Sequence, residues 1–165
     1  MALILIGALA ALAAGLYYYD TRVKPEAFRP ITQLNYKLLE VDGSLYDSVE
    51  RRNKHKTVLV YMPDNISSET QTKYMEVVSR APMAAAKNLN LVVVSRIDID
   101  NLRNLKRLSG FSGPLLRDPS GSILQKTKGG RPADKFAEWL TVELGEDGGI
   151  QRVKLANQPE VSWLE

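Results

Sequence analysis

Residues 57–70, TVLVYMPDNISSET, decide how this chain folds. The first part, 57–62, is apolar and rich in β-branched side chains, which predicts a buried strand. The proline and the polar residues after it predict a turn. Ser67 or Ser68 then caps a helix, and Glu69 lies in its first turn, where the helix dipole favours an acidic side chain. The stretch predicts a strand, a turn and a helix in succession, as in an α/β domain.

Apolar periodicity predicts further strands and helices on both sides of this stretch. The expected elements are strands over 34–41, 57–62 and 89–97, helices over 44–52, 68–89 and 101–108, a hairpin of 114–118 with 123–127, and a last helix over 132–144. Pro82 should kink or restart the long helix. Asp100 is the expected cap of the helix over 101–108, and a strand-end acid followed by a helix cap describes Asp98 and Asp100 better than a cation site does.

Two longer stretches resemble the thioredoxin-like superfamily: RIDIDNLRNLKRLSGFSGPLL (96–116) and DPSGSILQKTKGGRPADKFAEWL (118–140). The resemblance covers residues 34–144 and implies a three-layer sandwich around a mixed sheet, in the order β-α-β-α-β-α-β-β-α. It also implies that Pro114 follows a cis peptide bond beside the active-site loop, since X-Pro bonds carry a small cis penalty. The positions that match the redox Cys-x-x-Cys of that superfamily are Ile66, Ser67, Ser68 and Glu69.

The chain contains no cysteine and one histidine, His55. Thiol–disulfide exchange and thiol peroxidase chemistry need a thiolate, so both are excluded for this chain. Ser67 and Ser68 have no visible general base, and we expect no enzymatic activity, no cofactor and no metal. The net charge of +3 is spread along the chain and gives no reason to expect a nucleic-acid partner, and no small-molecule substrate is identified.

Residues 1–19 include an uncharged apolar run, ALILIGALAALAAGLYYY, which predicts one transmembrane helix. Its closing tyrosines, Tyr17, Tyr18 and Tyr19, suit the membrane interface, and Arg22 and Lys24 mark the water side. These charges favour a C-terminal domain on the cytoplasmic, matrix or stromal side of the membrane. A signal peptide is the alternative, but such peptides carry basic residues before the apolar run.

Gly7, Ala11 and Gly15 are spaced so that they lie on one face of the expected membrane helix. Small residues at this spacing let another membrane helix approach closely, so we expect integral membrane proteins as partners beside the lipid bilayer itself. Chance spacing in an alanine-rich segment is the alternative interpretation.

Three segments lie outside the regular pattern. Residues 20–33 contain two prolines and are expected to form an extended linker. The basic stretch RRNKHK (51–56) either meets anionic lipid headgroups or is a solvated loop. The tail 145–165 contains Trp163 and Leu164, which we expect to dock on a partner or on the domain itself.

Together these observations lead to an expected function. A membrane helix joined to a cysteine-free thioredoxin-like domain is typical of a non-catalytic accessory or structural subunit that stabilises a larger membrane complex, such as a photosynthetic or respiratory one. The alternatives are a membrane-tethered assembly factor or chaperone, and an enzyme or ligand binder that works without cysteine.

Overall fold

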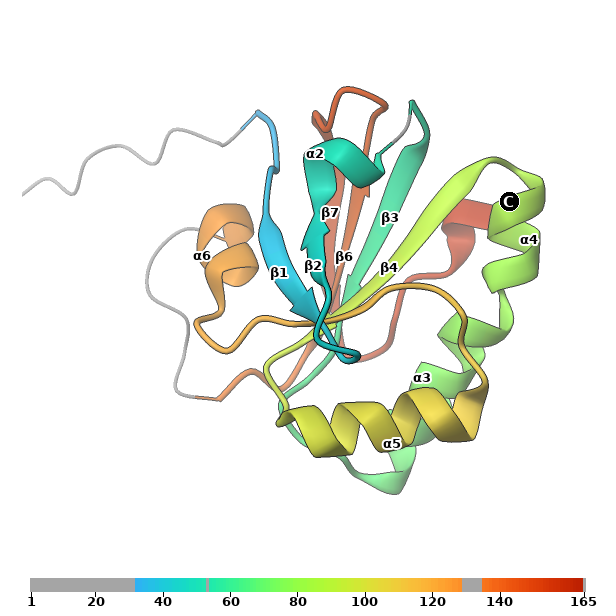
Figure 1. The fold of residues 1–165 in the computed structure, drawn as a ribbon, viewed down its shortest axis with the longest axis vertical. Helices are drawn as coiled ribbons and strands as arrows, with labels where there is room; N and C mark the ends of the chain where they lie inside the picture. Colours follow the sequence, from blue (N-terminus) through green and yellow to red (C-terminus); the bar gives the residue numbers. More distant parts are fainter. Residues whose placement is uncertain (1–31, 53, 129–134, 165) are drawn as a thin grey trace, which may run out of the picture. The chain divides into compact units, whose positions relative to one another are not determined.

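In the computed structural model, which describes residues 32–52, 54–128 and 135–164, seven strands form one mixed sheet (Figure 1). The strands are β1 (Lys37–Glu40), β2 (Leu45–Asp47), β3 (Lys56–Tyr61), β4 (Leu89–Ser95), β5 (Leu115–Arg117), β6 (Trp139–Leu144) and β7 (Ile150–Ala156). Their order across the sheet is β2-β1-β5-β4-β3-β6-β7. The three central strands β5, β4 and β3 are parallel, and every other pairing is antiparallel.

The expected strands at the centre of the domain are confirmed. β3 and β4 pair in parallel from Lys56 opposite Leu89 to Tyr61 opposite Val94. Both strands are buried over most of their length because helices or loops cover both faces. This explains why their sequences are continuous apolar runs without an alternation of polar residues.

The helices lie on the two faces of the sheet and complete the three layers that were expected. They are α2 (Ser48–Arg51), α3 (Ser68–Ser79), α4 (Ala81–Ala86), α5 (Ile99–Ser109), α6 (Ser122–Lys128) and a short 3-10 helix η1 (Ser162–Leu164). One apolar core joins α3, α4 and α5 to one face of the sheet. A second core joins α6 to the other face.

The long helix expected over 68–89 is two helices. α3 ends at Ser79, and α4 begins at Ala81 with Pro82 in its first turn. Proline has no N–H to donate and is tolerated only at the start of a helix, so the predicted restart at Pro82 is confirmed.

The hairpin expected from 114–118 and 123–127 is wrong. Its first strand is β5, but the second segment is helix α6. The buried Asp118 carboxylate accepts the backbone N–H groups of Ser122 and Ile123, both at 2.9 Å, and so caps the helix. The PSGS turn starts a helix because this cap stabilises its first turn.

The helix expected over 132–144 is also wrong, because β6 occupies 139–144 and pairs antiparallel with β3. The helix was predicted because apolar residues recur at helical spacing and would form one buried face. Ala137, one of these residues, is exposed. The aromatic and β-branched residues of β6 are buried on both faces, and this environment favours a strand. A turn at Gly148 and Gly149 then leads into β7, so much of the expected tail 145–165 belongs to the sheet.

The N-terminal end of the described domain lies at this turn. The last residues of the expected linker, Thr32 and Gln33, lie beside it: the Thr32 carbonyl accepts the Ile150 N–H at 2.9 Å, and Gln33 forms a bridge with Gly149. The buried Arg52 side chain donates to the Asp147 carbonyl and, at 2.8 Å, to the Asn35 side chain. These bonds fix the start of the domain on the β6–β7 turn.

Candidate functional site

The loop after β3 leads to the start of α3, at the carboxyl ends of the parallel strands, where α/β domains commonly place their sites. Ser67 is the N-cap of α3: its backbone is extended and its hydroxyl oxygen accepts the Thr70 N–H at 3.1 Å. The sequence placed the cap at Ser67 or Ser68, and the structure selects Ser67.

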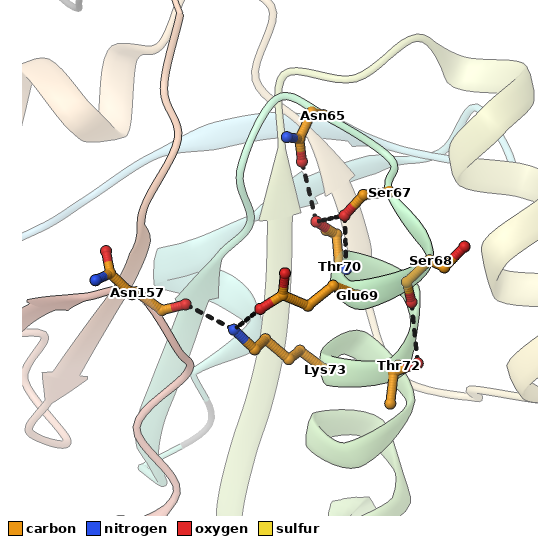
Figure 2. Close-up of polar contacts among 8 residues, drawn as sticks. All are labelled: Asn65, Ser67, Ser68, Glu69, Thr70, Thr72, Lys73 and Asn157. Atoms are coloured by element: carbon orange, nitrogen blue, oxygen red, sulfur yellow. Dashed lines mark hydrogen bonds and ion pairs between the residues drawn. The ribbon is translucent and has the colours of Figure 1, made fainter.

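Three polar side chains close a network around this cap (Figure 2). The Thr70 hydroxyl donates to the Asn65 side-chain oxygen at 3.0 Å, and the Ser67 and Thr70 hydroxyl oxygens lie 3.0 Å apart. Because the single Thr70 hydroxyl proton goes to Asn65, Ser67 is the donor in the second bond. Thr70 is only 5% exposed. Neither a carboxylate nor an imidazole takes part, so neither hydroxyl has a base to activate it.

The other residues matched to the redox motif point elsewhere. Ile66 packs against the apolar core, and the Ser68 carbonyl accepts a bond from the Thr72 hydroxyl. Glu69 pairs with Lys73 at 2.6 Å, one helical turn later, and this bond lowers the pKa of Glu69. Lys73 also donates to the Asn157 carbonyl at 2.9 Å (Figure 2). The four positions stabilise a helix start and do not converge on a common point.

Asp64 is the residue at this edge that the sequence did not single out. Its N–H donates to the Phe136 carbonyl and its carboxylate accepts the Phe136 N–H, both at 2.7 Å, while Arg96 lies 3.6 Å from the same oxygen. The other carboxylate oxygen is buried without a hydrogen-bond partner among the described residues. The signal in the sequence was an acid three residues after the end of β3, but its partner is distant along the chain.

The two other acids at this edge, Asp98 and Asp100, belong to the start of α5. Asp98, not Asp100, is the N-cap of α5 and accepts the Asn101 N–H at 3.0 Å, which lowers the pKa of Asp98. Asp100 instead pairs with Arg103 at 3.2 Å. Among the residues that the structure describes, no three His, Cys, Asp or Glu side chains come together as a metal site would require.

Pro114 does not lie beside the α3 start, and its peptide bond is trans. β5, which follows it, is parallel to β3, so Pro114 precedes a strand at the opposite edge of the sheet. There it lines a depression together with Tyr46 and Phe111. The residue that does approach the loop is Phe136, because β6 is antiparallel to β3 and begins at the edge where β3 ends.

Trp163 packs against its own domain. Its side chain is partly buried on the core shared by β3, α3 and β6, and its indole N–H donates to the Glu160 carbonyl at 2.7 Å. Leu164, its expected companion, ends η1. Trp163 thus contacts its own domain, and docking of Trp163 and Leu164 on a partner stays a prediction.

The expected membrane segment lies outside the described residues, and so do its packing residues Gly7, Ala11 and Gly15, its tyrosines 17–19, and Arg22 and Lys24. Within the part of the chain that the structure does describe, every helix is too short or too polar to cross a membrane.

Comparison with known proteins identifies the fold. No protein-family model and no curated protein matches the chain. Among solved structures, peroxidoxin BcpB of Mycobacterium tuberculosis is 16% identical with a TM-score of 0.68, over 76% of this chain and 83% of that one. PrxQ of Xylella fastidiosa, in a cysteine-to-serine variant, is 16% identical with a TM-score of 0.66, over 81% and 86%. The bacterioferritin comigratory protein of Xanthomonas campestris, studied for alkyl peroxide reduction, is 16% identical with a TM-score of 0.61, over 73% and 80%.

At this identity the likeness shows the fold alone: a thioredoxin-like fold in the form that peroxiredoxins have. It also overturns the function expected from the sequence. The expected accessory subunit or assembly factor of a membrane complex finds no support, because the structural neighbours are peroxiredoxins.

Proposed function

We propose that this chain is a peroxiredoxin-fold pseudoenzyme, a protein that keeps the fold of a peroxide-reducing enzyme but does not reduce peroxides. The observation that carries the proposal is the closed hydrogen-bond network of the Ser67 and Thr70 hydroxyls at the start of α3. The chain contains no cysteine. Peroxide reduction by a protein thiol oxidises a thiolate to a sulfenic acid. A serine or threonine hydroxyl cannot take that step.

The electrostatic setting of such a reaction is retained. The N-terminus of a helix stabilises an anion and lowers the pKa of a thiol placed there, whereas the C-terminal end does not. α3 carries one exposed serine near each end, Ser68 and Ser79. These two positions allow a matched comparison on one helix.

Peroxide consumption by the full chain tests the proposal. In the presence of a thiol reductant, the unmodified protein should consume hydrogen peroxide or an alkyl hydroperoxide no faster than buffer does. The Ser68→Cys thiol should have a pKa below the ~8.5 of free cysteine, and Ser79→Cys should not. Catalytic turnover by the unmodified protein would disprove the proposal.

We further propose that residues 1–19 attach the domain to a bilayer. Their apolar composition, Tyr17–Tyr19 at the interface, and Arg22 and Lys24 beyond them support an anchor with the domain on the cytoplasmic, matrix or stromal side. The face of Gly7, Ala11 and Gly15 would pair with a helix of another integral membrane protein. Full-length protein that stays in the supernatant when membranes are pelleted would contradict the attachment.

A further inference from the structure

The edge of the sheet opposite the α3 start is basic. β3 begins there at Lys56 and β4 at Leu89, and α2 and the β6–β7 turn lie at the same edge (top of Figure 1). We call the exposed residues Val49, Arg51, Lys54, Lys56 and Lys87 the basic edge.

Basic side chains surround a depression at this edge. A hollow of about 490 Å³ is lined by Lys54, His55, Lys56 and Lys87. Its lining also includes one acidic residue, Glu146. Lys54 has a φ of 59°, and Asn88, also in the lining, has a φ of 55°. A left-handed backbone costs roughly 1–2 kcal/mol at a lysine, whereas an asparagine adopts it more readily. Two of them in one hollow indicate that the surrounding turns are held in shape by the fold.

Three exposed acids, Glu50, Glu146 and Asp147, also lie near the basic edge. The Asp147 carboxylate accepts the Gly149 N–H at 2.8 Å, and Glu50 lies in the field of Lys37. Within the described ranges, Lys54 and Lys56 form no ion pair. The positive charges of Lys54 and Lys56 are therefore available to an external anion.

The start of the described domain lies at the same edge. Thr32 and Gln33 are bonded to the β6–β7 turn. Between Tyr19, where the apolar segment ends, and Thr32, an extended chain spans at most about 45 Å. A bilayer that holds residues 1–19 is thus within reach of the basic edge.

We infer that the basic edge docks on an anionic lipid surface, with its lysines among the headgroup phosphates and Val49, which is 56% exposed, at the interface. This inference rests on the membrane attachment proposed above. Charge complementarity selects lipid as the occupant, and the position of Thr32 allows this edge to reach the bilayer. The α3 start then faces away from the membrane, because it lies at the other end of β3.

The absence of cysteine gives a direct test, since one introduced cysteine carries the only label. The full chain is labelled at Val49→Cys with an environment-sensitive fluorophore and placed in nanodiscs. The discs contain phosphatidylcholine alone or with about 30% phosphatidylglycerol. Ser68→Cys, exposed at the opposite edge, is the matched control. We expect the Val49 label to be shielded from an aqueous quencher only in anionic discs, and the Ser68 label in neither.

Charge and salt distinguish docking from other causes. Lys54→Glu with Lys56→Glu should reduce the docked population by about tenfold or more, because each basic residue contributes roughly a fivefold factor. For the chain with unchanged lysines, raising the salt to about 1 M should have the same effect. A Val49 label equally accessible in both kinds of disc would overturn the inference but not the attachment.

Two further outcomes also count against lipid docking. If inorganic phosphate removes the shielding and chloride of equal ionic strength does not, the hollow holds a free anion and the inference fails. If the chain does not stay with the discs at all, the attachment and the docking both fail. Neither result bears on the absence of peroxidase activity, which is measured separately.

Discussion

Ser67 and Thr70 show how one pair of hydroxyls can stabilise the start of a helix. Ser67 accepts the Thr70 N–H, and Thr70 in turn binds Asn65, so each hydroxyl is used within the loop and the first helical turn. Hydrogen bonds that are satisfied locally stabilise the helix start and leave no lone proton donor for a substrate.

Ser67→Ala should lower the free energy of unfolding by about 1 kcal/mol, because it removes the N-cap and leaves the Thr70 N–H without its acceptor. Ser68→Ala, one residue later, should change it by less than about 0.5 kcal/mol, because Ser68 is exposed. Urea unfolding followed by circular dichroism measures both. Equal losses in the two variants would mean that Ser67 is not the cap.

At this scale the sequence predicted the kind of residue but not always the position. A capping serine at 67 or 68 was correct, whereas the cap of α5 is Asp98 and not Asp100. Adjacent polar residues compete for the same cap, and the choice depends on where the preceding strand ends. The role of Asp64 could not be predicted, since its partner Phe136 follows many residues later.

Among the elements, those with strong apolar runs were predictable and the short C-terminal ones were not. β3 and β4 are buried on both faces and have the composition of central strands. α6 was expected to be a strand and β6 part of a helix. For β6, the prediction failed because helical spacing in 132–144 coincided with strand-favouring residues. Pairing of β6 with β3 decided the outcome, and such a long-range contact leaves no local signal.

The C-terminal segment after β7 should contribute to stability through Trp163. Trp163→Ala should lower the free energy of unfolding by about 1–3 kcal/mol, less than full burial of a tryptophan would imply, because the side chain is only partly buried. Leu108→Ala is the control, since Leu108 is 55% exposed and should change stability by less than about 0.5 kcal/mol. A Trp163→Ala variant as stable as the unmodified protein would show that the segment does not dock on its domain.

For the molecule as a whole, the buried tyrosines predict a loss of stability in alkali. Burial raises the pKa of four phenols: Tyr36, Tyr46, Tyr61 and Tyr74. For Tyr46 the pKa rises to about 12. Unfolded tyrosine ionises near pH ~10, so this stability is fully present below pH ~10 and is lost as the pH rises through the folded value.

The free energy of unfolding should therefore fall above pH ~10 by about 1.4 kcal/mol per pH unit for each such tyrosine. Tyr46→Phe should make the slope shallower while keeping the ring stacked on Tyr36, 6.0 Å away. Denaturant titrations at several alkaline pH values measure the slope. An unchanged slope in the variant would exclude Tyr46 as a contributor.

The bonds between Thr32 and the β6–β7 turn have a consequence for the order of folding. Thr32 and Ile150 lie near opposite ends of the described chain, yet they share a backbone hydrogen bond. During synthesis the N-terminal part emerges first, but its attachment to the sheet must wait for the last hairpin. Contacts this distant in sequence also slow the search for the native topology. The segment that would tether the domain is thus secured late, when the final strands have been made.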